Sequence, residues 1–229
     1  MVVYYLSSMS PRPRTVTDAD IIQAAARVIV KIGPTRLTLA HVGRASGLSP
    51  GALVKRFGSK RGLLLAMSRQ AMESVDACFA AVRTAHPAPL DAFVAAALEM
   101  TRYVQTPEEV ANHLAFLQID ISDPDFYALM KANSGSIEAG YRALLDEAIK
   151  AGDLERCDTA RLARAVGALV SGSLLGWAID GRGTAEAYVC ADLGMLLDRY
   201  RTARGKTRSA TASRRASVRP AKSSRARTS

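Results

Sequence analysis

The sequence of 229 residues is poor in cysteine, with only Cys78, Cys157 and Cys190. The three stand far apart and are odd in number, so they form neither the short spacing of a zinc site nor the pairs of a disulfide framework. We therefore expect no bound metal, and we expect a protein that works in the reducing cytoplasm.

Long hydrophobic runs are also missing. The longest, residues 165–179, lies between Arg164 and Asp180 and is shorter than the roughly 20 residues of a membrane-spanning helix. The early stretch "VVYYL" follows no positively charged residue and is too short for the apolar region of a signal peptide. We expect neither a membrane span nor a signal peptide, and Met9 is an alternative start to Met1.

Common enzyme motifs are scarce as well. The sequence has no Walker phosphate loop, no H-E-x-x-H and no paired His/Cys set. Ser171 and Ser173 flank Gly172 inside an apolar helical segment, not at the strand-to-helix turn that exposes a nucleophilic serine. The sequence predicts that the protein is not an enzyme and uses no cofactor.

What the sequence does contain is positive charge, placed at its two ends. Residues 1–65 carry ten Lys/Arg against two acids, and residues 199–229 carry eleven against none. Residues 66–198 carry ten Lys/Arg against nineteen acids. A basic start, an acidic middle and a basic tail indicate a polyanionic partner for the two ends.

The hydrophobic pattern is helical throughout, and no alternating run is long enough for a confident strand. It predicts an all-α fold of about nine helices, separated by Pro, Gly or Asp. Thr17 and Asp20 fit a capping box at the first helix, and Gly33-Pro34 ends it. The predicted helices are 18–32, 39–46, 50–57, 60–85, 90–104, 107–119, 125–151, 159–179 and 185–204.

The third of these helices is barely two turns long, too short to be stable alone in water. Ser49 is placed to cap it, and Gly47 supplies the left-handed turn that a helix-turn-helix needs. On a helical wheel Leu53 and Phe57 face inward, while Lys55 faces outward.

The outward face of this helix is small and basic, and no carboxylate occurs between residues 34 and 70. Gly51 lies beside Lys55 on that face, with Ala52 and Val54 on its flanks. Such a face suits the DNA major groove, because small residues let the backbone approach and Lys reaches phosphates or guanine edges. The residues alone also allow a plain helical hairpin with a solvated basic face.

Residues 18–65 resemble the DNA-binding domain of the TetR family of transcriptional regulators. The matching features are the "AA" of the first helix, Gly33, Leu37-Thr38, Val42, the "GLS" of residues 47–49, Gly51, Leu53, Phe57, Ser59-Lys60 and Leu63. The chain departs from the family at Val54, where members usually carry an aromatic residue, and at Gly43, where they usually carry alanine.

The resemblance implies a homodimer that binds a palindromic operator on double-stranded DNA and, most simply, a repressor that a small-molecule effector releases. It implies that Thr38, Ser49 and Lys60 position phosphates and that Gly51, Ala52 and Lys55 lie near base edges. Val54 and Arg56 complete the predicted DNA-binding set. The upstream Arg12 and Arg14 are either a minor-groove arm or a solvated leader.

The resemblance also divides the chain. The predicted units are a flexible arm over 1–16, a DNA-binding domain over 17–65 with its helix-turn-helix at 38–57, a ligand-sensing and dimerisation domain over 66–204, and a disordered basic tail over 205–229. The tail is a non-specific DNA tether, a solvated extension or a partner for the acidic middle. If the tail alone binds nucleic acid, the protein is instead a non-specific architectural binder.

Two sets of residues in the middle domain are candidates for ligand and partner contacts. The ligand-pocket candidates are Tyr103, His113, Phe116, Phe126, Tyr127, Met130 and Trp177. Any one of these residues is more often an ordinary core or structural side chain than a ligand contact. The dimer candidates, on the last two helices, are Gly172, Leu175, Gly176, Leu193, Leu196 and Leu197.

Overall fold

A computed structural model describes residues 16–203 and Gly205; it does not describe the side chains of Met100 and Tyr103. Arg12, Arg14 and nearly all of the basic tail lie outside these residues. The described residues form helices joined by short turns, with one isolated antiparallel bridge between Leu154 and Arg201. The all-α prediction is confirmed.

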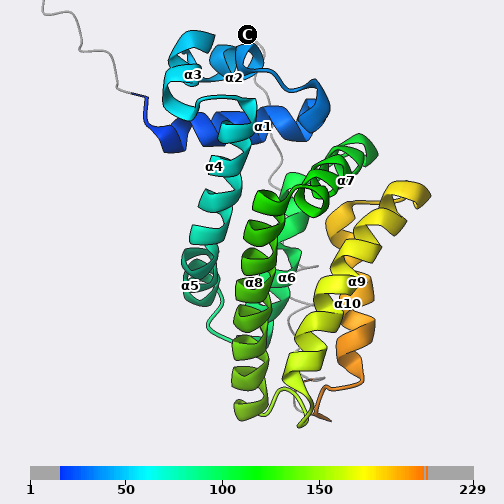
Figure 1. Ribbon diagram of the computed structural model, residues 1–229. Coiled ribbons are helices and arrows are strands. Elements are labelled where there is room, and N and C mark those ends of the chain that lie inside the picture. Colours follow the sequence, from blue (N-terminus) through cyan, green and yellow to red (C-terminus); the bar gives the residue numbers. More distant parts are fainter. Residues whose placement is uncertain (1–15, 204, 206–229) are drawn as a thin grey trace, which may run out of the picture.

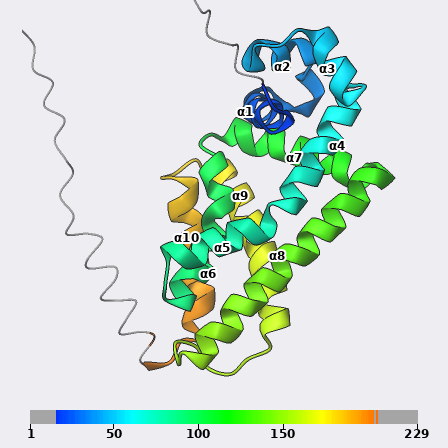
Figure 2. The ribbon, with the colours of Figure 1, turned by 90° about the vertical axis from the view of Figure 1, so that its left-hand side faces the viewer.

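The helices fall into two parts, which we call the head and the body (Figures 1 and 2). The head comprises α1 (Asp18–Arg36), α2 (Leu39–Ser46) and α3 (Pro50–Phe57). The body comprises α4 (Lys60–Glu73), α5 (Val75–Ala85), α6 (Pro89–Leu98), the 3-10 helix η1 (Glu99–Tyr103), α7 (Pro107–Ser122), α8 (Pro124–Lys150), α9 (Thr159–Asp180) and α10 (Ala185–Asp198). In both views α4 descends from the head into the body, and α7 lies beneath α1.

Local capping explains why the head helices begin where they do. The Thr17 hydroxyl accepts the N–H of Asp20 at 3.2 Å while the Asp20 carboxylate accepts the N–H of Thr17 at 2.9 Å, which completes the predicted capping box. Thr38, Ser49 and the serine before α4 each accept the N–H three residues on. Each cap satisfies a backbone donor that has no partner inside its helix.

The first helix bends at Gly33, whose φ of 75° and ψ of 163° lie outside helical geometry. Pro34 follows and has no N–H to donate back along the helix. The prediction that Gly33-Pro34 ends the helix is thus physically right, although one more turn, up to Arg36, follows the bend.

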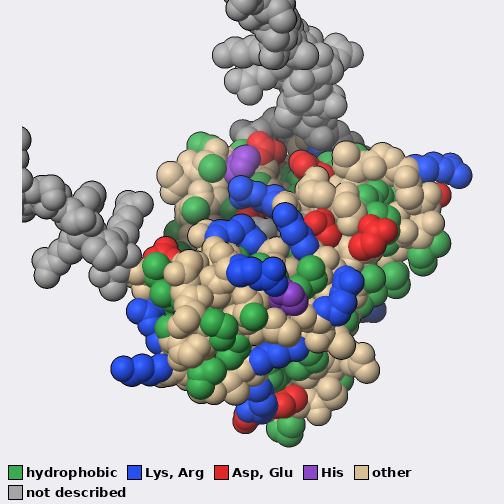
Figure 3. Space-filling model, turned by 90° about the horizontal axis from the view of Figure 1, so that it is seen from above, with side chains coloured by type: hydrophobic (Ala, Val, Ile, Leu, Met, Phe, Trp, Pro, Cys, Tyr) green, Lys and Arg blue, Asp and Glu red, His purple; other side chains and the backbone are tan. Residues whose placement is uncertain are grey.

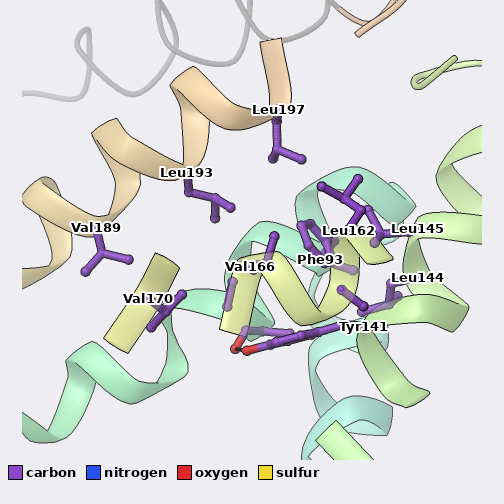
Figure 4. Packing of buried hydrophobic residues seen from close by; sticks show 14 of the residues in the cluster. Phe93, Tyr141, Leu144, Leu145, Leu162, Val166, Val170, Val189, Leu193 and Leu197 are labelled. Carbon is purple, nitrogen blue, oxygen red and sulfur yellow. Dashed lines mark hydrogen bonds between the residues drawn. The ribbon is translucent and has the colours of Figure 1, made fainter. Parts of the chain in front are cut away.

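The body is built around one apolar cluster drawn from α5, α6, α8, α9 and α10. Figure 4 shows Leu193 and Leu197 of α10 pointing into it, toward Val166 and Leu162 of α9 and Phe93 of α6. Burial of these side chains supplies the main stabilisation, since each contributes on the order of 1.5–3 kcal/mol when fully removed from water.

A second apolar cluster lies under the head but is not confined to it. Ile21, Val42 and Leu53 of the head pack there with Phe126 of α8, and Phe116 of α7 packs against the same cluster. The rings of Phe116 and Phe126 meet edge to face with centroids 6.3 Å apart. Head and body therefore share a continuous core.

The structure differs from the predicted helices mainly in the body. The helix predicted over 60–85 is interrupted at Ser74, and the helix predicted over 90–104 ends at Leu98 and continues as η1. The last helix ends at Asp198, earlier than predicted, because the following backbone pairs with the α8–α9 connection. There Thr202 donates its N–H to the carbonyl of Asp153 at 3.1 Å.

Helix α9 is the one helix among the described residues whose length and composition would suit a membrane span, with a mean hydropathy of 1.5 over 18 residues. From the sequence, the apolar run in this helix, residues 165–179, was predicted to be too short to span a membrane. One side of α9, including Leu162, Val166 and Trp177, is buried in the core of the body. The apolar side chains on this side of α9 pack against other helices of the body, as those of a core helix do.

Candidate DNA-binding face and effector cavity

Helix α3 presents the predicted small and basic face to solvent. Leu53 is 0% exposed and anchors the helix to the core of the head. Gly51, Val54 and Lys55 are exposed, and Ala52 is partly buried. Among the described residues, Lys55 has no hydrogen-bond or ion-pair partner, so its ammonium group is free to meet a phosphate or a base edge.

The turn before α3 is held by backbone contacts. Gly47 has a φ of 73°, and the N–H of Leu48 donates to the carbonyl of Gly43 at 2.9 Å. A Cβ atom added at Gly43 would lie 2.5 Å from the Leu48 carbonyl oxygen, which is closer than any real contact. The departure from alanine at this position therefore lets α2 and the turn approach closely.

Arg56 and Lys60 are engaged within the protein. The Arg56 guanidinium donates to the carbonyl of Val16 at 2.7 Å and pairs with Asp18 at 3.2 Å. The Lys60 ammonium donates to the carbonyl of Thr35 at 3.2 Å. Both side chains therefore hold α3 and α4 against α1, and DNA would have to compete for them.

The electrostatics of this face are positive. Thr38 and Ser49 cap the N-termini of α2 and α3, where backbone N–H groups and the helix dipole favour anions. Seen from above, Lys and Arg side chains lie across the middle of this face (Figure 3). Because residues 34–70 contain no carboxylate, no acid within that segment offsets this charge.

We predicted from the sequence that no G-x-S-x-G elbow occurs, but one motif in the turn fits that pattern. Residues 47–51 read GLSPG, which matches the G-x-S-x-G pattern of serine hydrolases. Here Ser49 stands between two helices, and its hydroxyl oxygen accepts the N–H of Ala52 at 3.2 Å. The serine is a helix cap, not a residue at the strand-to-helix turn that the hydrolase pattern requires.

Beneath the head lies a cavity of about 310 Å³ between α1, α4, α7 and α8, partly open to solvent. Its walls are mostly apolar, with a few polar groups. The lining residues are Ile29, Val30, Met67, Ser68, Ala71, Val104, Glu109, Asn112, His113, Phe116, Asp120, Leu129, Met130 and Asn133.

Three of the predicted pocket residues, His113, Phe116 and Met130, line this cavity. The other described candidates do not. Phe126 is buried under the head, Tyr127 is exposed, and Trp177 is buried in the body, where its indole N–H donates to the carbonyl of Gly183 at 3.3 Å. The side chain of Tyr103 lies outside the described residues.

Besides the predicted His113, the cavity holds polar groups that were not predicted from the sequence, Asp120 and Asn133 among them. Burial raises the pKa of the Asp120 carboxyl to about 6. His113 is exposed by area at the edge of the cavity, yet the surrounding protein lowers the pKa of its imidazole, which favours the neutral form. The Asn133 side-chain oxygen is buried and has no hydrogen-bond partner among the described residues.

A single hydrogen bond connects the cavity wall to the bend of α1. The Asn112 amide nitrogen donates to the carbonyl of Val30 at 2.8 Å. In an unbroken helix that carbonyl would accept from residue 34, but Pro34 has no N–H. A Cβ atom added at Gly33 would lie 2.5 Å from the Asn112 side-chain oxygen, so only glycine lets α7 approach this closely. The sequence does carry one signal of this contact. Because Pro34 has no N–H, the carbonyl of Val30 needs a donor from elsewhere, and Asn112 supplies it.

A cluster around Arg61 lies at the top of the body, where α4 leaves the head. Its guanidinium donates three hydrogen bonds to Asp123, at 2.8, 2.9 and 3.0 Å, and one to Asp125 at 2.7 Å. It also lies 5.6 Å from the centre of the Phe126 ring. The hydrogen bonds from Arg61 lower the pKa of Asp123. The cluster ties the start of α4 to the start of α8.

The last two helices carry an exposed apolar face, but its residues differ in part from the dimer candidates. Leu193 and Leu197 are buried within the protomer, so they cannot contact a partner, and Leu196 is partly buried. Gly176 faces the Tyr188 ring of α10 within the same chain, and a Cβ atom there would lie in ordinary contact with that ring, at 3.5 Å.

Gly172 and Leu175 are exposed on α9. Ile179 and Met195, which sequence reasoning missed, are 79% and 70% exposed and extend the same apolar character. Their exposure could not be read from the sequence, because apolar residues recur on all sides of these two helices.

Comparison with known proteins agrees with this geometry. Residues 21–67 match the family model described as bacterial regulatory proteins of the tetR family. Among the curated proteins, none matches this chain.

Solved structures match over most of the chain. The TetR-family regulator PfmR from Thermus thermophilus has 26% identity and a TM-score of 0.54, with 80% of this chain and 96% of that chain covered. A putative transcriptional regulator from Saccharomonospora viridis in complex with choline has 18% identity and a TM-score of 0.65, with 81% of this chain and 97% of that chain covered. SmeT, the repressor of a Stenotrophomonas maltophilia multidrug efflux pump, has 20% identity and a TM-score of 0.59, with 82% of this chain and 92% of that chain covered.

Proposed function

We propose that this chain, a transcriptional regulator with the DNA-binding domain of the TetR family, is a repressor that binds a palindromic operator as a homodimer and is released by a small-molecule effector. The observation that carries the proposal is the placement of the cavity. Its walls include α1, which packs in the same apolar cluster as the DNA-binding helix α3, so a molecule in the cavity touches a support of the DNA-binding face.

In the proposed complex α3 enters the major groove. Lys55 is the free cation of its outward face, and Gly51 allows close approach of the backbone. Thr38 and Ser49 place helix N-termini against phosphates on either side. Arg56 and Lys60 act first as supports of α3, since both are bonded to the segment from Val16 to Arg36.

The proposed dimer forms through the exposed apolar face of α9 and α10. Leu175, Ile179 and Met195 are large side chains left in water, which is unfavourable for a monomer and typical of an interface. Burying them against a second copy would place two α3 helices on one duplex. The operator half-sites would then be about one helical turn, roughly 34–36 Å, apart.

Release requires only that the effector bind two states differently. The hydrogen bond between Asn112 and Val30 joins the cavity wall to the head, and the Arg61 cluster joins α8 to the start of α4, the helix that leaves the head. A ligand that moves α7 therefore changes the bend of α1 or the start of α4. Either change alters the separation of the two α3 helices in the dimer.

The proposal is tested by fluorescence anisotropy with a labelled duplex from the DNA upstream of the protein's own gene and with a scrambled duplex, each at two salt concentrations. We expect a preference of about a hundredfold or more for the native duplex, within the usual range of specific binding. A chain ending at Gly205 should keep this preference. Lys55→Ala should weaken binding and lower the salt slope by about one, whereas Lys150→Ala, at the far end of α8, should change neither.

The alternative function is a non-specific nucleic-acid binder that acts through the basic tail, and the eleven positive charges after residue 198 favour it. It predicts equal binding to both duplexes and loss of binding in the shortened chain. Dimerisation is tested separately by sedimentation: Ile179→Glu combined with Met195→Glu should yield monomers, while Ile121→Glu, an exposed site on α7, should not.

A further inference from the structure

The cavity contains one carboxylate that nothing in the described protein balances. Asp120 is partly buried in the cavity wall and has no hydrogen bond or ion pair among the described residues. The other cavity carboxylate differs, because Glu109 accepts the N–H of Gln105 at 2.6 Å and that of Thr106 at 3.3 Å. The charge of Glu109 is thus used to cap α7, whereas that of Asp120 is left for a ligand.

The remaining polar groups of the cavity are also suited to a positive ligand. None of its described lining residues is Lys or Arg. The Asn133 oxygen is a buried acceptor without a donor, and the lowered pKa of His113 favours an uncharged imidazole. Phe116 adds an aromatic ring, whose face attracts cations.

We infer that the effector is a small organic cation with a single positive charge and an apolar body, held by an ion pair with Asp120. This inference rests on the proposed function of the cavity as the effector site. Buried charges in proteins are normally paired, and a cationic ligand supplies the missing partner. A neutral ligand would leave Asp120 unpaired, and an anionic one would be repelled by it.

The size and walls of the cavity narrow the class further. A volume of about 310 Å³ lies at the small end of the roughly 300–1,000 Å³ of ligand pockets, so the ligand is compact. The apolar side chains of Ile29, Met67 and Leu129 surround the rest of the space and favour hydrocarbon over polar substituents.

The inference is tested by isothermal titration calorimetry of the full chain with three probes that share a six-carbon chain: hexyltrimethylammonium, 1-hexanol and hexanesulfonate. We expect hexyltrimethylammonium to bind at least about tenfold more tightly than 1-hexanol, a difference of about 1.4 kcal/mol, with hexanesulfonate the weakest. In Asp120→Asn the preference for the cation should fall to about twofold or less. Glu108→Gln removes an exposed carboxylate of the same helix outside the cavity, and this variant should keep the original preference for the cation over 1-hexanol.

Acidification supplies a second readout. Among the described lining residues the titratable groups are Glu109, His113 and Asp120, all on α7, while α1, α4 and α8 contribute none. Lowering the pH from 7.5 to 5 protonates Asp120 and should weaken cation binding about tenfold, following its pKa of about 6. Asp120→Asn retains His113, so any pH dependence that persists in this variant measures the histidine.

Equal binding of the three probes, tightest binding of the sulfonate, or no detectable binding of the cation would overturn the inference. Because calorimetry involves no DNA, these outcomes are independent of the operator experiment. A protein that binds its operator specifically but not the cation refutes the inference alone. If the protein binds the cation in the cavity but binds no operator, the proposed function is refuted. The cation is then a ligand of the cavity but not an effector of DNA binding.

Discussion

The head and the body are specified in different ways. In the head, each helix start has its own capping side chain within three residues, and the turn before α3 has its own glycine. In the body several helix starts are capped in the same way, but the break between α4 and α5 at Ser74 has no glycine, proline or side-chain cap to mark it. A surface built from one short stretch can therefore be recognised from sequence, whereas a cavity built from four distant helices cannot.

The first prediction concerns whether the two parts fold as one. Leu53→Ala removes a fully buried side chain from the shared core and should lower the free energy of unfolding by about 2–5 kcal/mol. Urea unfolding should remain a single transition, because Phe126 of the body packs in the same cluster. The control Val54→Ala, on the exposed face of α3, should change stability little. Two separate transitions would show that head and body are independent.

The second prediction concerns the connection between the parts. Asn112→Ala leaves the Val30 carbonyl without its donor and should cost about 1–3 kcal/mol, the usual penalty for an unsatisfied buried group. Asn133→Ala is the matched control, because the Asn133 oxygen has no partner to lose. Thermal unfolding distinguishes the two, and equal effects would mean that the hydrogen bond contributes nothing specific.

The third prediction concerns the charge in the body's cavity. The pKa of Asp120 is raised from 3.8 to about 6, so the folded state holds its proton more tightly than the unfolded state, and this group makes the protein less stable as pH rises from 3.8 to 6. Asp120→Asn should therefore stabilise the ligand-free protein at pH 7 by about 1–2 kcal/mol, reduced from the full shift because the side chain is partly solvated. Denaturant unfolding at pH 7 and pH 4 checks this, and the gain should vanish at pH 4.

The fourth and smallest prediction concerns the local signals of the head. Ser49→Ala removes the cap of α3 and should cost about 1 kcal/mol, while Ser49→Gly should cost only a few tenths. Ser171→Ala, an exposed serine within α9, should stay within about 0.5 kcal/mol of the original protein. Equal losses at both serines would contradict the view that α3 depends on its own cap.

The outcome of sequence reasoning follows the same division. The bounds of α2 and α3 and the inward position of Leu53 were predicted correctly, because they depend on caps, turns and spacing within about twenty residues. The break at Ser74 was missed because no glycine, proline or side-chain cap marks it. Downstream of it, Phe79 packs edge to face on Tyr141, with centroids 5.8 Å apart.

The cavity was predicted only in part for a related reason. His113, Phe116 and Met130 were identified as aromatic or unusual residues of the middle domain, and they line the cavity. Asp120 and Asn112 look, in sequence, like ordinary polar residues of a solvated helix face. Tertiary packing makes Asp120 a partly buried carboxylate of the cavity wall and Asn112 a hydrogen-bond donor to α1.

The proline in α1 has a consequence for how this protein can change over generations. An amide hydrogen missing at position 34 is supplied, in effect, from position 112, and glycine at position 33 makes the room for it. We therefore expect the three positions to covary among relatives, although they lie on opposite sides of the head–body boundary. In relatives that carry another residue in place of Pro34, we expect position 112 to vary freely, and in relatives that keep Gly33-Pro34 we expect a hydrogen-bond donor there.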